Sequence, residues 1–224
     1  MSGIVLWDFD GTLAERPGRW RACLVEVLDE HEPEHGVDPG ALRPFLRDGF
    51  PWHRADVEHP ELCDPDAWWE ALVPLLTRAY EGVGLPPARA AELARHLRAR
   101  YVDPTLGWRL FDDTLQALTR LRAAGWRSVI LSNHVPELEQ IVDGIGLAPH
   151  VDVVLCSAVT GYEKPHPEAF ATALRLTRNG ERVWMVGDNP EADVAGGRRA
   201  GLPAILVRGD GVGLDDAATE ILAS

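Results

Sequence analysis

Two carboxylates and a tight turn follow the first apolar run of the chain. Residues 4–6 read Ile-Val-Leu, and Asp8-Phe9-Asp10-Gly11-Thr12 follows after one tryptophan. A run that is apolar throughout predicts a strand at the centre of a sheet covered on both faces. Ligands of open α/β sheets bind beyond the carboxyl ends of the strands, so these acids stand where chemistry is expected. The alternative interpretation is an Asp-rich turn that only caps the next helix, because Asp and Gly are common turn residues.

Three further polar segments follow apolar runs later in the chain. They are Ser132-Asn133-His134, Lys164-Pro165, and Gly187-Asp188-Asn189 followed by Asp193. Each one alone has an ordinary structural explanation, as a helix cap, a solvated lysine or a turn. Because parallel strands bring their carboxyl ends to the same edge of a sheet, all four segments together predict one site.

The elements that must position these segments alternate from about Gly107 onward. Apolar runs predict strands and amphipathic segments predict helices; the strands are 127–131, 151–155, 183–186 and 204–207, and the helices are 112–124, 135–145, 167–177 and 190–200. Asp112 or Asp113 can cap the first of these helices, while Gly125 and Gly201 stand where helices should end. This alternation predicts an α/β fold with a Rossmann-like, doubly wound parallel sheet.

The segment from Pro17 to Pro104 has helical periodicity and no convincing strand. Its best predicted helices are 20–28, 67–80 and 87–100. We therefore expect a core domain made of residues 1–16 and 105–224, interrupted by an all-helical domain at 17–104. Since the insertion follows the acidic turn directly, we expect it to lie over the carboxyl edge of the sheet as a lid.

The composition of the chain limits which kinds of molecule the protein can bind. The chain has 224 residues, 25% of them charged, and a net charge of −13 with no Lys/Arg block, which argues against nucleic acid. Three widely spaced cysteines, Cys23, Cys63 and Cys156, favour reduced thiols in a cytosol. No signal peptide is recognisable and no run approaches the length of a membrane span, so we expect a cytoplasmic protein without membrane contact. An acidic protein that acts on an anion needs a local positive charge, such as a metal ion, a lysine or helix N-termini.

The four polar segments, taken in order, resemble the motifs of the haloacid dehalogenase-like (HAD) hydrolase superfamily. The matching motifs are DxDGT, a Ser/Thr followed by Asn, a lysine, and GDxxxxD, and they span Asp8 to Asp193. The strand-helix alternation is similar to the whole core of that family. The helical insertion is similar to its C1-type cap domain.

This resemblance implies phosphoryl transfer through an aspartyl-phosphate. Asp8 stands at the position of the family's nucleophile, and Asp10 stands at that of the general acid/base. Ser132 and the backbone amide of Asn133 are expected to hold phosphoryl oxygens. Lys164 is expected to pair with both the nucleophile and the phosphate.

The resemblance also implies a Mg²⁺ ion, because two carboxylates would repel a phosphate. Oxygen ligands suit this ion, and we expect them from Asp8, the Asp10 carbonyl and Asp188. Asp193 is expected either to ligate the ion or to orient its bound water. The Thr12 hydroxyl is expected either to support the turn, and so the phosphate site, or to orient Asp10.

The motif residues also separate the subclasses that the resemblance suggests. Dehalogenase relatives need no second acid at the position of Asp10, so Asp10 favours phosphate chemistry. Phosphonoacetaldehyde-cleaving relatives use a cap lysine, whereas Lys164 is the only lysine in this chain. We therefore predict a Mg²⁺-dependent phosphatase that acts on a small phosphorylated metabolite. A sugar phosphomutase and a non-catalytic ligand-binding member of the family are the alternatives.

The predicted cap offers several candidates for substrate recognition. Arg54 or Arg19 could clamp a substrate carboxylate or a second anionic group, and Trp52 could cover it. The pair Trp68-Trp69 is interpreted as core, because one of two adjacent helical positions must face inward. His134 either touches the substrate or caps its helix.

Overall fold

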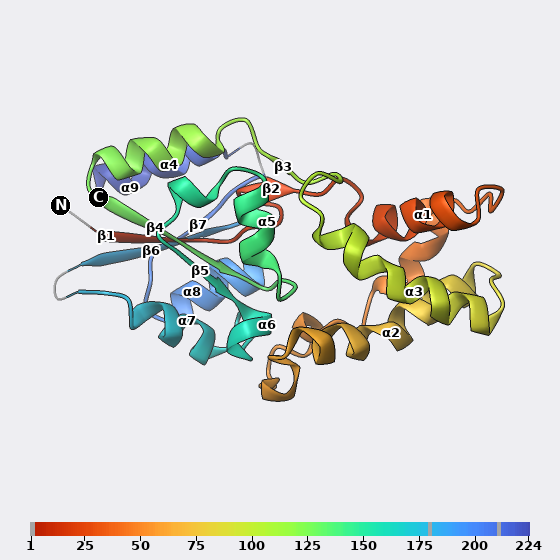
Figure 1. The fold of residues 1–224 in the computed structure, drawn as a ribbon. Coiled ribbons are helices and arrows are strands. Elements are labelled where there is room, and N and C mark those ends of the chain that lie inside the picture. The colour runs from red at the N-terminus through yellow and green to blue at the C-terminus, as the bar shows by residue number, and fades with distance from the viewer. Residues whose placement is uncertain (1–2, 179–180, 210–211) are drawn as a thin grey trace.

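A five-stranded parallel sheet forms the centre of one half of the molecule (Figure 1). The computed structural model describes residues 3–178, 181–209 and 212–224. The strand order is β5-β4-β1-β6-β7, and the strands are β1 (Gly3–Trp7), β4 (Trp126–Ser132), β5 (Val153–Cys156), β6 (Arg182–Gly187) and β7 (Ala204–Leu206). β1 is central, with Trp7 in register with Ile130 of β4 and Val186 of β6. Every residue of β1 is buried, which explains why this segment is apolar throughout.

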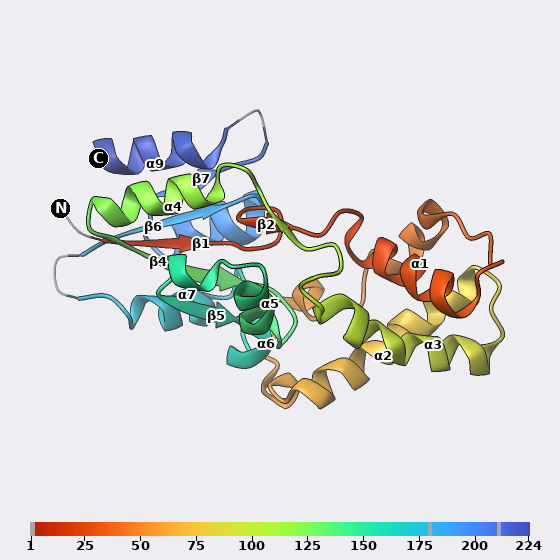
Figure 2. The same cartoon turned by 45° about the horizontal axis from the view of Figure 1, so that its top comes forward.

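Helices cover both faces of the sheet, as the sequence predicts. They are α4 (Thr114–Ala123), α5 (Leu138–Gly144), α6 (Ser157–Thr160), α7 (Pro167–Leu174), α8 (Gly196–Arg199) and α9 (Leu214–Ala223). Figures 1 and 2 show α4 and α9 together on one face and α7 on the other. The side chains of β1 alternate accordingly: Val5 and Trp7 belong to the cluster that includes Leu118 of α4, while Ile4 and Leu6 pack in the cluster around Phe170 of α7.

Two details of these helices differ from the sequence prediction. The helix predicted at 190–200 begins as a π-helical turn, Pro190–Ala195, and only α8 continues it. Asp113 precedes α4 but makes no side-chain cap, because its carboxylate binds the Arg208 guanidinium and the Leu214 amide instead. Asp113 therefore ties α4 to α9 and to the segment after β7.

The other half of the molecule is helical (Figures 1 and 2). It contains α1 (Arg19–His31), α2 (Pro65–Gly82), α3 (Pro87–Val102) and short 3₁₀ helices at Pro39–Leu46, Pro51–Arg54 and Pro60–Leu62. No strand occurs between residues 17 and 104, all of which are described. Trp68 and Trp69 are both buried, which confirms their interpretation as core. Trp20 stacks on Tyr101 with ring centroids 4.1 Å apart, joining α1 to α3.

A small antiparallel ribbon lies where the chain leaves and re-enters the sheet half. It pairs β2 (Ala14–Glu15) with β3 (Arg109–Leu110), and Arg109 forms an ion pair with Glu15 at 2.6 Å. Nearby, the Thr114 hydroxyl donates a hydrogen bond to the Leu13 carbonyl at 2.7 Å. The sequence did not predict this ribbon, because two-residue strands are too short to show an alternating pattern.

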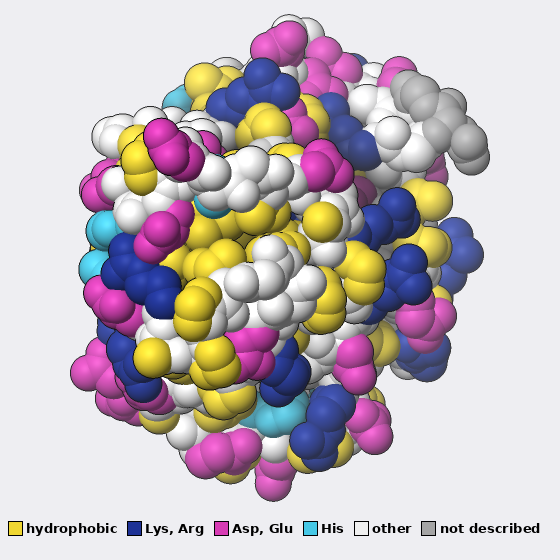
Figure 3. Space-filling view, turned by 90° about the vertical axis from the view of Figure 1, so that its right-hand side faces the viewer, with side chains coloured by type: hydrophobic (Ala, Val, Ile, Leu, Met, Phe, Trp, Pro, Cys, Tyr) yellow, Lys and Arg dark blue, Asp and Glu magenta, His cyan; other side chains and the backbone are white. Residues whose placement is uncertain are grey.

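Charges of both signs are spread over the molecular surface. Figure 3 looks onto the free end of the helical half, where hydrophobic side chains gather in the middle and acidic and basic side chains surround them. The three cysteines are free. Among the described residues, no helix combines the length and the hydrophobicity that crossing a membrane requires.

Candidate active site

The four polar segments meet at the carboxyl edge of the sheet, as the sequence predicts. Asp8 follows β1, Ser132 ends β4 and Asp188 follows β6, while Lys164 comes from the loop between α6 and α7. They line a cavity of about 430 Å³ together with Asp10, Asn133, Asp193 and residues of the helical half.

Asp8 is buried between two hydrogen-bond donors. The Ser132 hydroxyl and the Lys164 ammonium each donate to Oδ1 of Asp8 at 2.8 Å. Burial alone would raise the pKa of Asp8, but the charge of Lys164 and these hydrogen bonds outweigh burial and lower it. Asp8 is therefore held as a carboxylate, which is the form that a nucleophile needs.

Lys164 is a buried cation between two acids. Its ammonium lies 2.8 Å from Asp8 Oδ1 and 2.6 Å from Asp193 Oδ1. Burial works against the charged form, but the charges of Asp193 and Asp8 prevail and raise the pKa of Lys164. The side chain of Asn133 holds the backbone of Lys164 on both sides, donating to its carbonyl at 2.8 Å and accepting from its amide at 2.6 Å. The sequence alone does not indicate this use of the Asn133 side chain.

Both carboxylate oxygens of Asp193 accept hydrogen bonds. Its Oδ1 accepts from Lys164, and its Oδ2 accepts from the amide of Asn189 at 3.0 Å. The approach is so close that a Cβ at Gly187 would lie 2.1 Å from Asp193 Oδ2, so only glycine fits there. The π-helical turn that replaces the predicted regular helix carries Asp193 and so brings its carboxylate back to Lys164.

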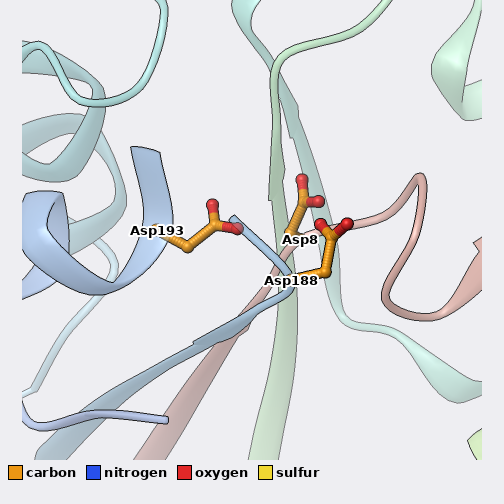
Figure 4. Close-up of side chains that lie close together, drawn as sticks. All are labelled: Asp8, Asp188 and Asp193. Atoms are coloured by element: carbon orange, nitrogen blue, oxygen red, sulfur yellow. The ribbon is translucent and has the colours of Figure 1, made fainter. Parts of the chain in front are cut away.

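Three carboxylates are close enough to share a cation. Asp8, Asp188 and Asp193 each offer an oxygen, and these atoms lie within 4.8 Å of one another (Figure 4). Carboxylate oxygen is the donor that hard divalent cations prefer. Both hydrogen bonds that the Asp8 side chain accepts go to Oδ1, whereas both oxygens of Asp193 accept hydrogen bonds. Asp8 and Asp188 are therefore better candidates than Asp193 for direct ligands.

Arg19 forms ion pairs with the other two acidic side chains of the site, Asp10 and Asp188. Its Nε lies 3.5 Å from Asp10 Oδ2, and its Nη2 lies 3.8 Å from Asp188 Oδ2. Burial raises the pKa of both carboxyl groups to about 6, with the charge of Arg19 acting in the opposite direction. Arg19 adopts a left-handed backbone conformation with φ of 49°, which is unfavourable for a residue with a Cβ. The sequence suggests Arg19 only as a substrate clamp. Its ion pairs with Asp10 and Asp188 join separate segments, so they leave no local sequence pattern.

Other predicted residues lie elsewhere. Arg54 does not line the cavity, although its neighbours Trp52 and His53 do. The Thr12 hydroxyl is buried without a hydrogen-bond partner among the described residues, while the Thr12 carbonyl accepts from Arg208 at 2.7 Å. Thr12 therefore supports the turn through its backbone.

His134 is part of the core. It is buried against Phe9 and Trp108, with ring centroids 5.4 and 5.3 Å away. Burial lowers the pKa of His134 to about 4, so the ring is neutral. His134 does not line the cavity, so it contributes to the site region by packing.

Comparison with known proteins agrees with this fold. The family described as haloacid dehalogenase-like hydrolases matches residues 3–201, and the chain belongs to this family. The fold is that of a HAD-type hydrolase.

Two relatives and one solved structure are similar to this chain over most of its length. The chain is 31% identical to the human haloacid dehalogenase-like hydrolase domain-containing protein 3, over 92% of this chain and 82% of that protein. It is 35% identical to the ribulose-1,5-bisphosphate 5-phosphatase of Halopiger xanaduensis, over 92% of this chain and 84% of the relative. The structure of a 2-haloacid dehalogenase from Pseudomonas syringae superimposes with a TM-score of 0.64 at 24% identity, covering 100% of this chain and 99% of the other. At that identity, the superposition shows the shared fold alone.

Proposed function

We propose that this protein is a Mg²⁺-dependent phosphatase that hydrolyses a small-molecule phosphomonoester through an aspartyl-phosphate on Asp8. The observation that carries the proposal is the buried Asp8 carboxylate, held ionised by Lys164 and Ser132 beside Asp188. An ionised carboxylate beside the Lys164 ammonium is suited to attack an electrophilic phosphorus. A relative named as a phosphatase, matched over most of both chains, supports the same reaction class.

The residues divide the reaction into two steps. A carboxylate oxygen of Asp8 forms a bond to phosphorus while the bond to the leaving oxygen breaks, and protonated Asp10 gives that oxygen its proton. In the second step a water molecule attacks phosphorus while the bond from phosphorus to the Asp8 oxygen breaks, and Asp10 accepts a proton from this water. Inorganic phosphate leaves, and the Asp8 carboxylate is restored. The pKa of about 6 for Asp10 suits a group that must both donate and accept a proton near neutrality. Ser132, Lys164 and the Asn133 amide bind the phosphoryl oxygens throughout.

The donor set fits a magnesium ion. Asp8, Asp188 and the Asp10 carbonyl would hold it, and Asp193 positions Lys164 instead, since both of its oxygens are already engaged. When bound, the ion offsets the negative charge that the substrate and the acids bring together.

We also propose that residues 17–104 act as a cap domain over a core made of residues 1–16 and 105–224. Trp52 and His53 support this division, because they come from the helical half and line the cavity of the sheet half. The β2–β3 ribbon lies close to both boundaries of this division, which supports a hinge there.

A phosphomutase remains the second candidate, because it uses both Asp8 and Asp10 in the same way. The two functions differ in what leaves the active site. We expect inorganic phosphate to be released steadily from several phosphomonoesters with Mg²⁺ and without a bisphosphate activator. Isomerisation of a sugar phosphate without net phosphate release would overturn the phosphatase proposal.

Replacing Asp10 with Asn is expected to remove proton transfer and keep the fold. With an alkyl phosphate, kcat should fall by about 10²- to 10⁴-fold, the usual contribution of a general acid/base. The first step should suffer less with p-nitrophenyl phosphate, whose leaving group needs little protonation. Steady-state and rapid-quench kinetics on both substrates test this difference; equal losses on both would contradict the role of Asp10.

The same variant tests the pKa of Asp10 without any reaction. The folded-state pKa is raised from 3.8 to about 6, so the folded chain binds an extra proton in this interval and its stability falls as pH rises through it. In metal-free protein above pH 6, Asp10→Asn should be more stable than wild type by about 3 kcal/mol, and the difference should vanish below about pH 4. Urea denaturation with a chelator present measures it.

Removal of divalent cations is expected to abolish activity reversibly. Chelation should stop phosphate release, and Mg²⁺ should restore it. In Asp188→Asn, which keeps the shape and removes the charge, we expect the Mg²⁺ concentration for half-maximal activity to rise by about tenfold or more. Full activity of the chelated enzyme, or an unchanged Mg²⁺ requirement in the variant, would contradict the metal site.

A further inference from the structure

A second cleft adjoins the candidate active site. It has a volume of about 650 Å³, and it shares Arg19 and Asp188 with the cavity that contains Asp8. Gly11 stands at the junction, where an added Cβ would lie 2.4 Å from Asp188 Oδ2 and 2.8 Å from Arg19 Nη2. A ligand whose phosphate occupies the Asp8 cavity could therefore extend directly into this cleft.

Arginines gather along the cleft. Its lining includes Arg19 and Arg21 of α1, Arg43 and Arg47 at the 3₁₀ helix Pro39–Leu46, and Arg16 before α1. Within the described residues, Arg21, Arg43 and Arg47 form no ion pair with an acidic side chain. This grouping matters in a chain whose net charge is −13, because the net charge repels anions and a local positive charge is needed to bind one.

The acidic residues of the cleft do not cancel this charge. Glu15 is already paired with Arg109 at 2.6 Å, and Asp188 lies 3.8 Å from Arg19. The side chains of Arg43 and Arg47 are exposed, so an anion can reach them from solvent. Arg16 is paired with Glu26, and Arg19 faces Asp10 and Asp188. The positive charge that remains in the cleft is therefore that of Arg21, Arg43 and Arg47.

The same cleft has an apolar wall. Trp20, Leu46, Phe50 and Phe111 line it together with the arginines. A short carbon skeleton can pack on this wall, while the charged groups at its two ends reach different sets of polar partners.

We propose that the substrate carries a second anionic group, which Arg43 and Arg47 bind in this cleft while the scissile phosphate lies against Asp8. This inference rests on the proposed phosphatase function and specifies its substrate class. The planar guanidinium pairs with carboxylate and phosphate in the same forked geometry, so either group satisfies the chemistry. Arg21 adds a third positive charge at the cleft.

A matched series of substrates tests the proposal. The compounds have one phosphate ester on a chain of three to five carbons and end in a hydroxyl, a carboxylate or a second phosphate. For the wild type, kcat/KM should be at least about tenfold higher for an anionic end than for the hydroxyl end, as expected for charge-assisted hydrogen bonds. The ending that gains more identifies the anion as carboxylate or phosphate.

The double variant Arg43→Gln/Arg47→Gln is expected to lose this preference. Its kcat/KM for anionic ends should fall at least about tenfold more than its kcat/KM for the hydroxyl end, mainly through KM. Arg95→Gln, at an exposed arginine of α3 outside both cavities, is the matched control and should keep the preference.

The outcomes separate this inference from the function on which it rests. If the wild type releases phosphate from every compound without preferring an anionic end, or if the double variant keeps the preference, the cleft does not bind a second anion. If the wild type releases phosphate from none of them, the phosphatase proposal fails and this inference fails with it.

Discussion

Replacing Asp8 with Asn is expected to lower the rate of phosphate release by at least about 10⁴-fold, because the amide cannot form the phosphoenzyme. Asn has nearly the same shape as Asp, and its side-chain oxygen can still accept from Ser132 and Lys164, which both donate to Asp8 Oδ1. The folded structure should therefore persist. Phosphate release measured with Mg²⁺ on the best available monoester tests this.

The control for this variant is its folded state. Far-UV circular dichroism and the urea midpoint should show that Asp8→Asn is folded like the wild type. Activity that survives unchanged in a folded variant would mean that Asp8 is not the nucleophile. An unfolded variant would shift the test to Asp8→Glu, which keeps the charge but displaces the attacking oxygen.

Replacing Lys164 with Met is expected to have the largest effect on stability. The ammonium lies between Asp8 and Asp193, and its removal leaves two buried acids without their cation. Breaking a buried ion pair on one side commonly costs about 3–5 kcal/mol, so we expect a loss in that range at neutral pH. Activity should fall as well, because the phosphate loses a positive partner. Urea denaturation of metal-free protein measures the free energy of unfolding.

A second substitution distinguishes this electrostatic cause from a loss of packing. Adding Asp193→Asn to Lys164→Met removes one of the uncompensated acids, so part of the lost stability should return, while activity should stay low. The loss in Lys164→Met alone should also shrink at acidic pH, where the acids take up protons. If the double variant were as unstable as the sum of its single substitutions, the ion pair would not be the cause.

The arrangement of the elements could be predicted from the sequence where each element has its own local pattern. β1 was predicted because a strand buried on both faces must be apolar throughout, and the buried pattern of Gly3–Trp7 agrees. The four polar segments were predicted to meet because parallel strands end at the same edge. The helical period of residues 17–104 predicted helices there, and the structure has helices and no strand between these residues.

Features made by contact between distant segments were not readable. The pairing of Arg19 with Asp10 depends on a left-handed turn at Gly18 and Arg19, which the order of residues does not reveal. The burial of His134 against Phe9 and Trp108 depends on three segments packing together. Neither Arg54 nor the arginine cleft could be placed from the sequence, since the 3₁₀ helices of the helical half set which arginines turn toward the site.

The roles of Asp193 and Asn133 show how the site depends on support around the reacting groups. Sequence motifs identified both residues, but their partners come from the fold. Asp193 binds the ammonium of Lys164, while Asn133 binds the backbone of Lys164. Both therefore act through Lys164, and substitutions at either should impair phosphate binding with less effect on metal binding.

The most direct test of the central proposal is to trap the phosphoenzyme during turnover. Enzyme mixed with substrate and Mg²⁺ is quenched in acid and treated with borohydride, which reduces an acyl phosphate to the alcohol, and the peptides are then sequenced by mass spectrometry. We predict homoserine in place of Asp8, and none in Asp8→Asn or in enzyme without substrate. Phosphate release with homoserine at another position, or with no reduced residue under conditions that trap acyl phosphates in a known phosphoenzyme, would contradict catalysis through Asp8.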